Sequence, residues 1–417
     1  MRGRKPDRPR DAHLSLRWES RDGWGPVAAA LGREDAPETL SAVALALYIE
    51  ASGFERSTSY SRRPAHYALP HRYRSRLYTY TRVLGAVDWL DGQGLIDHAK
   101  ANPGQRGWQS TMRATPDLVD LVQDALHSDV TVRMPPESVI LRDADKHPIE
   151  YRETRETRRI RCQIEAQNEA IKGEDLGGDN VLQINAPVRR IFNEKLSLGG
   201  RFYAEGGGWQ TLTKVERLRL RIGGEPVVEV DYSQFHPTLA YAQAGHPVPR
   251  EAYDVPGFDR ELVKVAFAVM LNSCNRNGAR YTIAYKPSMV RKIIGDDIPD
   301  DLRGEEMWHW AARLDPGYAQ TASRQAELLI DRLMQRHAPI SGMFFIGIGL
   351  TFQRLDSDIA EAVMKEMRHR GIVVLPVHDS FLAPASKADV LEEVMVAAAA
   401  KLGAAVVCTC SSTVPTG

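Results

Sequence analysis

Cysteine and long apolar runs are both scarce in this chain. Only four of its 417 residues are cysteines, and their spacing fits neither a zinc site nor a disulfide framework: Cys162, Cys274, Cys408 and Cys410. The run nearest to a membrane span, residues 342–352, is shorter than the roughly 18 to 20 apolar residues that such a helix needs. We therefore expect no membrane contact, reduced cysteines and a cytoplasmic location.

An excess of either charge is also missing, since 54 Lys and Arg balance 54 Asp and Glu. A net charge of zero neither favours nor excludes nucleic acid, so the distribution of charge matters more. The chain is long enough for two or three domains, and its 43% apolar and 26% charged residues are typical of a globular protein. The basic first ten residues have no apolar stretch behind them, so we expect a frayed tail and no secretory signal.

Acidic residues are absent from residues 56–82, which hold seven arginines and five tyrosines. Arginines can neutralise phosphates and tyrosines can stack on bases, so this run favours contact with nucleic acid. A solvated basic surface is the alternative. The compensating acidic cluster is interpreted as an exposed loop, because glycine and proline surround it: Asp296, Asp297, Asp300, Asp301, Glu305 and Glu306.

The pattern of the first 130 residues predicts a separate domain. Apolar spacing predicts a buried helix over 39–51 and further helices and strands in this order: helix 74–91, strand 94–99, turn 102–107, strand 108–114 and helix 116–126. This order resembles the winged helix-turn-helix of DNA-binding proteins. The resemblance implies a helix in the major groove and a wing with Arg106 and Lys100 near the backbone. A winged helix used only for packing is the alternative.

Residues 131–182 form the second predicted part, a helical connector. A helix over 151–171 mixes arginines with glutamates, and a loop follows over 173–180. A solvated helix crossed by salt bridges explains this pattern, and a thumb-like element that grips nucleic acid is the alternative. The third predicted part is residues 183–417.

Two segments of this third part each end an apolar strand with an aspartate. The first is Val-Glu-Val-Asp-Tyr-Ser-Gln-Phe-His at 228–236, and the second is Leu-Pro-Val-His-Asp-Ser-Phe at 375–381. The aspartates are Asp231 and Asp379. Two carboxylates that converge from separate strands can hold the pair of Mg²⁺ ions used in in-line phosphoryl transfer.

Segments before and between these aspartates add basic groups. Residues 198–204 read Leu-Gly-Gly-Arg-Phe-Tyr-Ala, and a helix over 260–272 places Arg260 and Lys264 on one face. Two cations on one face can meet a triphosphate, although two exposed basic residues need no ligand. A helix that Gly371 ends and a strand over 372–377 complete a pattern that suits a palm-like α+β sheet.

In this order the motifs resemble the palm and fingers of family A DNA polymerases and of phage-type single-subunit RNA polymerases, over roughly residues 183–390. Asp231-Tyr232-Ser233-Gln234 resembles the first metal-binding motif in its DNA-polymerase form. His378-Asp379-Ser380 resembles the last motif, in a form nearer the RNA polymerases. The fold class implied is α+β, a polymerase palm of antiparallel sheet and helices with small fingers, preceded by the winged-helix-like domain.

The resemblance also implies roles for individual residues. Asp231 and Asp379 would hold two Mg²⁺ ions, or Mn²⁺ in their place, with the Tyr232 carbonyl as a further ligand. Arg260 and Lys264 would bind the triphosphate, and His378 and Arg201 would position the primer end. Further contacts to substrate or nucleic acid are implied for Gln234, His236, Asn272 and Gln353.

Two positions depart from the family pattern. Asn272 stands where the fingers helix normally has a tyrosine, and His236 stands where DNA polymerases have a glutamate. The family uses those two residues to exclude the sugar 2′-hydroxyl, so the choice of sugar stays open. No exonuclease-like region is present, and the fingers are short.

Three readings follow from the sequence. The leading one is a template-directed nucleotidyltransferase, a compact DNA polymerase whose partners are a nucleic-acid template, a primer or nascent strand and nucleoside triphosphates. An RNA polymerase or primase of the phage single-subunit type is the near alternative. A DNA-binding replication or regulatory protein with an inactive polymerase fold is the alternative of another class. A two-metal nuclease is less favoured, because it has no need of the Arg260 and Lys264 helix. The oligomeric state is left open.

Overall fold

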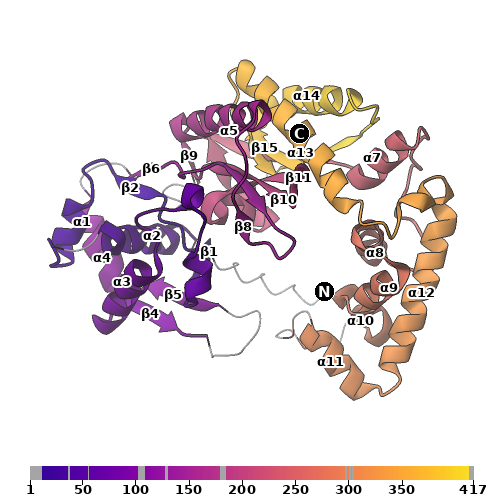
Figure 1. Ribbon diagram of the computed structural model, residues 1–417, viewed down its shortest axis with the longest axis horizontal. Helices are drawn as coiled ribbons and strands as arrows, with labels where there is room; N and C mark the ends of the chain where they lie inside the picture. The colour runs from indigo at the N-terminus through magenta and orange to yellow at the C-terminus, as the bar shows by residue number, and fades with distance from the viewer. Residues whose placement is uncertain are drawn as a thin grey trace. The chain divides into compact units, whose positions relative to one another are not determined.

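The computed structural model describes residues 12–35, 38–54, 56–101, 109–126, 130–178, 185–295, 298–299, 302 and 305–412. Helices and several small sheets make it an α+β protein, as the sequence predicts (Figure 1). None of the described helices is both long and apolar enough to cross a membrane. Four of the six residues of the acidic cluster, Asp296, Asp297, Asp300 and Asp301, lie outside the described residues. The other two, Glu305 and Glu306, begin helix α11, Glu305–Leu314, so the predicted loop was wrong there.

The chain divides into two compact units. Unit 1 is Met1–Asp231, Ser357–Met395 and Cys408–Gly417, and unit 2 is Tyr232–Asp356 and Val396–Val407. The predicted division into 1–130, 131–182 and 183–417 stays a prediction.

Unit 1 opens with helices packed on a small sheet. Its first elements are β1 Ala12–His13, β2 Trp18–Ser20, α1 Gly25–Ala30, α2 Glu38–Phe54, β3 Thr58–Tyr60, η1 Pro64–Tyr67, η2 His71–Tyr73, α3 Tyr80–Gly92, β4 Ile96–Ala99, β5 Ser110–Ala114, α4 Pro116–Ala125 and β6 Val130–Val132. The sheet has the order β1-β3-β5-β4, and β2 pairs with β6. Every residue from Ser41 to Glu50 is buried, so α2 is the buried helix that the sequence predicts.

The helix predicted over 74–91 was wrong at its start, because α3 begins at Tyr80. Thr79 is extended, with ψ of 154°, and the Leu77 carbonyl accepts a hydrogen bond from Thr39 Oγ1 at 3.0 Å. The segment before α3 therefore packs on α2 as extended chain. The predicted turn at 102–107, with Arg106, lies outside the described residues, and Lys100 Nζ lies 3.3 Å from Asp91.

The basic run of residues 56–82 is largely neutralised by carboxylates of the same chain. Four of its arginines form ion pairs: Arg56 with Glu50, Arg62 with Asp88, Arg72 with Glu150 and Arg76 with Glu38. Asp88 lies on α3, one of the helices of the predicted winged-helix-like domain. The run thus presents fewer unpaired cations to nucleic acid than its composition indicates, and DNA binding by this region stays a prediction.

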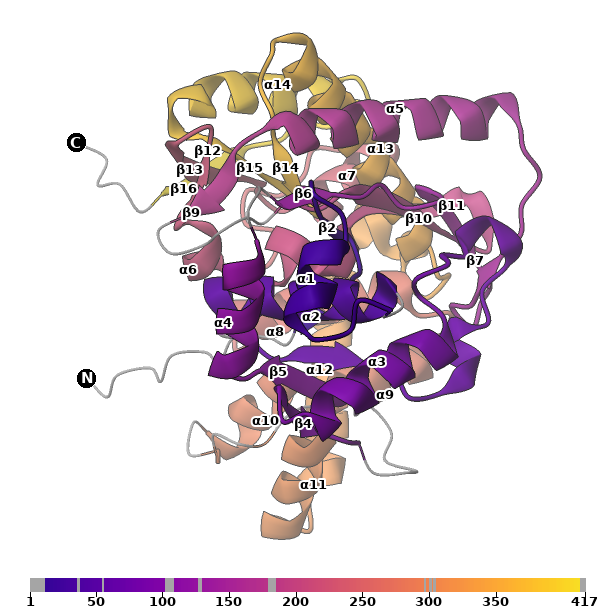
Figure 2. The same ribbon diagram turned by 90° about the vertical axis from the view of Figure 1, so that its left-hand side faces the viewer.

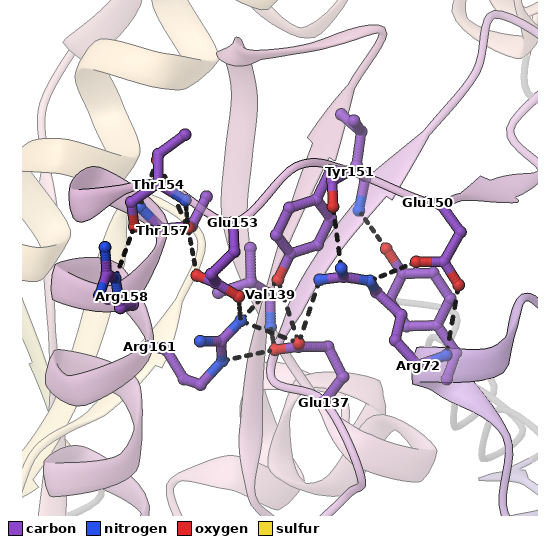
Figure 3. Close-up of polar contacts among 12 residues, drawn as sticks. Arg72, Glu137, Val139, Glu150, Tyr151, Glu153, Thr154, Thr157, Arg158 and Arg161 are labelled. Carbon is purple, nitrogen blue, oxygen red and sulfur yellow. Dashed lines mark hydrogen bonds and ion pairs between the residues drawn. The ribbon is translucent and has the colours of Figure 1, made fainter.

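A buried carboxylate joins this region to the connector helix (Figure 3). Glu137 accepts hydrogen bonds from Arg161 at 3.1 and 3.0 Å and from the Tyr151 hydroxyl at 3.0 Å. Arg72 approaches the same carboxylate to 3.6 Å. Arg161 belongs to α5, Arg155–Gly173, whose capping box is formed by Thr154. This part of α5 is therefore tied into the protein and is not simply a solvated helix.

The remainder of unit 1 is built on two further sheets. Its elements are β7 Val139–Arg142, β8 Pro148–Ile149, β9 Leu176–Gly178, β10 Val188–Asn193, β11 Lys195–Ala204, η3 Glu205–Thr211, α6 Lys214–Arg217, β12 Leu220–Ile222, β13 Glu225–Tyr232, β14 Leu375–Val377, β15 Ser380–Pro384, η5 Ala385–Lys387, α14 Ala388–Ala400 and β16 Cys408–Ser412. One sheet has the order β11-β10-β7-β8, and α5 packs against its β10 and β7 (Figure 2).

The larger sheet has the order β14-β15-β13-β12-β9, with β16 added on β13. The pairings from β14 through to β9 are antiparallel. β9 lies within the segment predicted as a loop over 173–180, so that prediction was wrong there: Leu176–Gly178 pairs with β12. Two glycines weaken the strand signal of this segment, and the pairing with β12 decides its conformation.

Unit 2 is mainly helical. It contains α7 Phe235–Gln243, α8 Arg260–Asn272, α9 Arg276–Ala284, α10 Pro287–Ile294, α11 Glu305–Leu314, α12 Tyr318–Arg336, η4 Ala338–Met343 and the start of α13 Gly349–His369. α8 to α12 pack on one another (Figure 1). α8 has the predicted bounds, because the Asp259 carboxylate caps its first turn through the amides of Glu261 and Leu262.

Candidate active site

Asp231 and Asp379 lie on neighbouring strands of the larger sheet. β13 carries Asp231 near its end, and β15 begins at Ser380, directly after Asp379. The antiparallel register places Asp231 opposite Ser380. Asp231 and Asp379 are far apart in the sequence, and the fold places one on β13 and the other directly before β15, the strand that pairs with β13.

Asp379 belongs to a tight hairpin turn. Val377 at the end of β14 pairs with Ser380, so His378 and Asp379 are the two central residues. His378 has a φ of +60°, the left-handed region at the position where such turns usually have glycine. Backbone of this kind in a non-glycine residue costs of order 1–3 kcal/mol and is concentrated at functional sites. The turn therefore favours a functional role for the His378 side chain.

A buried ion pair stabilises this turn through Ser380, the residue that follows it. Glu229, two residues before Asp231 on β13, is 5% exposed and accepts hydrogen bonds from Arg217 Nε at 3.0 Å and Nη2 at 2.9 Å. The Ser380 hydroxyl donates to the same carboxylate at 3.0 Å. One carboxylate therefore connects β13, α6 and the first residue of β15.

The strand before the turn is fixed from its other side. The Pro376 carbonyl accepts hydrogen bonds from Trp209 Nε1 at 2.9 Å and from Gln210 Nε2 at 2.8 Å. Gln210 also bonds the backbone of Phe202 and Ala204 on β11. β11 and β14 are therefore held together, and β11 is the strand that carries Arg201.

Arg201 follows two glycines that shape β11. Gly199 and Gly200 have φ of +73° and +83°. A Cβ at Gly200 would lie 2.7 Å from the Phe192 ring, and one at Gly199 would lie 2.4 Å from Asn193 Nδ2. Residues with side chains would be both strained and crowded here, so the Gly-Gly pair before Arg201 is required by the bulge in the β10–β11 pairing.

A fully buried arginine lies behind this bulge. Arg190 donates from Nε to the Gly200 carbonyl at 2.7 Å and from Nη2 to Ser357 Oγ at 2.8 Å and Asp358 at 2.7 Å. It also pairs with Glu361. The second half of α13 is thereby attached to the strand that presents Arg201. Asp358, five residues after Gln353 on α13, is a partner in this network.

The surroundings of His378 favour its neutral form. The residue is exposed, but the pKa of its ring is lowered, first by the loss of hydration among the surrounding protein. The positive charges of Arg201 and Arg217 lower the pKa further, while Asp379 opposes them. The Tyr203 ring lies edge-on at 6.0 Å between centroids. A neutral imidazole next to Asp379 can donate or accept one hydrogen bond without adding charge.

Unit 2 holds the other predicted residues of the first motif. Tyr232 is buried and stacks on Phe235 at 4.3 Å, and His236 is half-buried in the first turn of α7. Gln234 adopts φ of +52° and uses both ends of its amide on the backbone, at the Arg250 carbonyl and the Ala252 amide. Gln234 thus fixes the start of α7, and its predicted role in binding stays a prediction.

The predicted triphosphate-binding residues lie along one exposed side of α8. Arg260 and Lys264 are exposed while Leu262, Val263, Ala266 and Phe267 are buried. The Arg260 guanidinium lies 5.5 Å from the centre of the Tyr253 ring. Asn272, at the end of the same helix, is also exposed and donates to the Ala268 carbonyl at 2.8 Å. Gln353 is half-buried on α13.

The aspartate pair has the donor chemistry of Mg²⁺. Within the described part of the chain, no group of three or more His, Cys, Asp or Glu is placed to hold a metal ion. Mg²⁺ retains water and binds through one or two carboxylates together with substrate phosphates. The two aspartates therefore fit a magnesium ion that arrives with a triphosphate, and not a closed structural site.

Sequence reasoning missed Glu229, Arg217 and Arg190. For Glu229 a signal was available, because an acidic residue inside an otherwise apolar strand needs a partner when it is buried. Its partner Arg217 belongs to a four-residue helix, α6, which carries little periodicity. Arg190 pairs with residues of α13, and only the folded chain brings these segments together.

Comparisons with known proteins show little. No protein-family model matches the chain, and no curated protein sequence matches it. Among solved structures, it is similar to the POL domain of Pol1 from M. smegmatis in a complex with DNA primer-template and dNTP, with a TM-score of 0.27 and 10% identity. The match covers 94% of this chain and 63% of that chain, so the chain spans less than two thirds of that domain. A TM-score this low does not bear on function, which we infer from the site and from the sequence motifs.

Proposed function

We propose that this chain is a template-directed nucleotidyltransferase, a compact DNA polymerase. The observation that carries the proposal is the position of Asp231 opposite Ser380 in the β13–β15 register, with Asp379 directly before Ser380 in a turn whose His378 has left-handed backbone. The order of the surrounding sequence motifs supports a polymerase in particular. In the reaction, a 3′-hydroxyl oxygen bonds to the α-phosphorus of a nucleoside triphosphate, the hydroxyl proton is lost, and pyrophosphate leaves.

The two aspartates would hold Mg²⁺, which supplies charge neutralisation on the triphosphate and raises the acidity of the 3′-hydroxyl. Arg201 adds positive charge beside the turn, suited to a phosphate of the primer strand. His378, kept neutral by its surroundings, can hydrogen-bond the primer end without repelling the ions. Triphosphate binding by Arg260 and Lys264 rests on the motif resemblance and on the exposure of both side chains.

Primer extension tests the proposal. We expect the protein with Mg²⁺ to extend a primed DNA template, and Asp379→Asn or Asp231→Asn to lower the rate about 10³-fold, because a metal contributes several kcal/mol to the transition state. Asp389→Asn is the matched control, since Asp389 is an exposed aspartate of unit 1 on α14. No incorporation with any mixture of dNTPs and NTPs, on DNA or RNA templates, would refute the proposal.

The same assay determines whether the protein prefers deoxynucleotides or ribonucleotides. The first motif favours deoxynucleotides, while His236 and Asn272 replace the residues that exclude ribose in the family pattern. Parallel reactions with dNTPs and NTPs measure kcat/KM for each. Preference for NTPs would make the chain an RNA polymerase or primase and leave the aspartate chemistry unchanged.

A further inference from the structure

A cavity of about 430 Å³ lies within unit 1, on the sheet that carries Arg201. Its walls come from the chain between β1 and β2, from residues 133–136 and from strands β7, β10 and β11. Four arginines and one carboxylate contribute to the lining: Arg17, Arg133, Arg142, Arg189 and Glu205. The proposed polymerase chemistry does not use this cavity.

Three of these arginines have acidic partners. Arg189 donates from Nε to Glu205 at 3.1 Å, Arg133 approaches Glu19 to 3.7 Å, and Arg17 approaches Glu50 to 3.9 Å. The carboxylates in and around the cavity are therefore already engaged. The lining keeps a positive excess.

Arg142 differs from the other three. Its Nε is buried and has no hydrogen-bond partner among the described residues. Burial lowers the pKa of its guanidinium, and the nearby positive charge of Arg189 lowers it further. A buried Nε without an acceptor is unfavourable in a folded protein, and an anion beside it would supply that acceptor. The planar fork of arginine matches the oxygens of a phosphate.

The other walls suit a sugar and a base. Tyr203 lines the cavity and is 37% exposed, so its ring is open to stacking. Leu14, Leu16 and Ile140 supply apolar surface. Ser15 Oγ is a second buried polar atom for which the described part of the chain holds no hydrogen-bond partner. Gly206 allows its part of the wall to approach Ser15 closely, because a Cβ at this position would lie 2.6 Å from the Ser15 side chain. A volume of 430 Å³ is near the lower end of ligand pockets, roughly 300–1,000 Å³.

We propose that this cavity binds one nucleoside phosphate unit, with the phosphate on Arg142 and the base against Tyr203. The unit comes either from a single strand of nucleic acid or from a free nucleotide. Tyr203 also contacts the His378 ring, so the cavity and the hairpin turn share a wall. A single strand leaving the turn would pass over Tyr203 into the cavity. The proposal concerns binding and does not depend on polymerase activity.

Fluorescence anisotropy on the full chain tests the proposal. The probes are a labelled oligothymidylate of about 12 nucleotides, a length typical of single-strand sites, and labelled ATP. EDTA is present throughout, so that binding does not depend on the aspartates holding a metal. Arg142→Gln removes the charge, and Arg142→Lys keeps the charge but loses the fork. Arg158→Gln is the matched control, because Arg158 is an exposed arginine of α5 outside the cavity lining.

We expect Arg142→Gln to weaken binding about tenfold, because it removes one charged hydrogen-bonding group. The affinity of Arg142→Lys should lie between those of Arg142→Gln and the natural protein, and Arg158→Gln should bind as the natural protein does. For a strand, the slope of log K against log salt should also fall by about 0.7. Arg142→Gln should melt no lower than the natural protein, because it removes an unpaired buried charge. An effect on the oligonucleotide alone identifies a strand, and an effect on ATP alone identifies a free nucleotide. Equal binding of both probes by Arg142→Gln and the natural protein would overturn the proposal, whether or not the chain extends primers.

Discussion

Glu229→Gln should destabilise unit 1 and impair the hairpin turn at Asp379. Glu229 is 5% exposed, and its partner Arg217 has 12% of its side chain exposed. Removing one member of such a buried pair costs about 3–5 kcal/mol, because the remaining charge keeps its desolvation penalty. Glutamine retains one acceptor oxygen for Ser380, so we expect the low end, about 3 kcal/mol.

The measurement is a double-mutant cycle in urea. Glu229→Gln combined with Arg217→Met removes both charges and should recover at least about 1.5 kcal/mol of the loss. Glu225→Gln, at the exposed start of β13, is the control and should change stability by less than about 0.5 kcal/mol. Primer extension at a temperature where the variants are folded should show Glu229→Gln with a lower kcat than the control. If the double variant were no more stable than Glu229→Gln, the turn would not depend on this ion pair.

Three further predictions concern other parts of the chain. Glu137→Gln should lower the free energy of unfolding in urea by about 2–3 kcal/mol. Glu153→Gln removes a more exposed carboxylate that pairs with the same Arg161, and it should cost under about 1 kcal/mol (Figure 3). Equal losses would contradict the role of burial. Burial lowers the pKa of His337 to about 4, so the folded protein favours the neutral ring. The free energy of unfolding should therefore fall as the pH drops from about 6.5 towards 4, by up to about 3 kcal/mol relative to His337→Gln. Parallel pH profiles of the two proteins would refute this. Gly200→Ala should melt lower than Gly224→Ala, because both have positive φ but only Gly200 faces close neighbours; equal melting would remove the steric argument.

The elements that local chemistry determines were predicted well. The Asp259 cap and the apolar spacing gave α8 its bounds, and the apolar run before Asp231 is a strand. The strand predicted over 372–377 is shorter than expected, because only Leu375–Val377 pairs with β15. Interactions distant in sequence decide the elements that were predicted wrongly. Leu176–Gly178 becomes a strand because β12 pairs with it, and residues 74–79 stay non-helical, with Leu77 bonded to α2.

The same distinction holds for the candidate site. The aspartates could be identified because each follows a strand, a signal contained in a few neighbouring residues. Arg142 carried no such signal, since an arginine at the end of a short strand is ordinary until the fold buries its Nε. Composition alone would also assign Arg56 to the binding of nucleic acid, but in the fold this arginine forms a buried ion pair with Glu50.

The unfavourable features of unit 1 bear on whether the site is active. His378 has left-handed backbone, Glu229 is a buried charge, and Gly199 and Gly200 shape the strand before Arg201. Strained backbone and buried charge each cost of order 1–3 kcal/mol or more against a glycine turn or an apolar pair. A domain selected only for packing or DNA binding gains nothing from keeping these features at the turn that presents Asp379. Their concentration there favours an active centre over an idle polymerase fold, and an inactive Asp379→Asn beside an active Asp389→Asn would establish it.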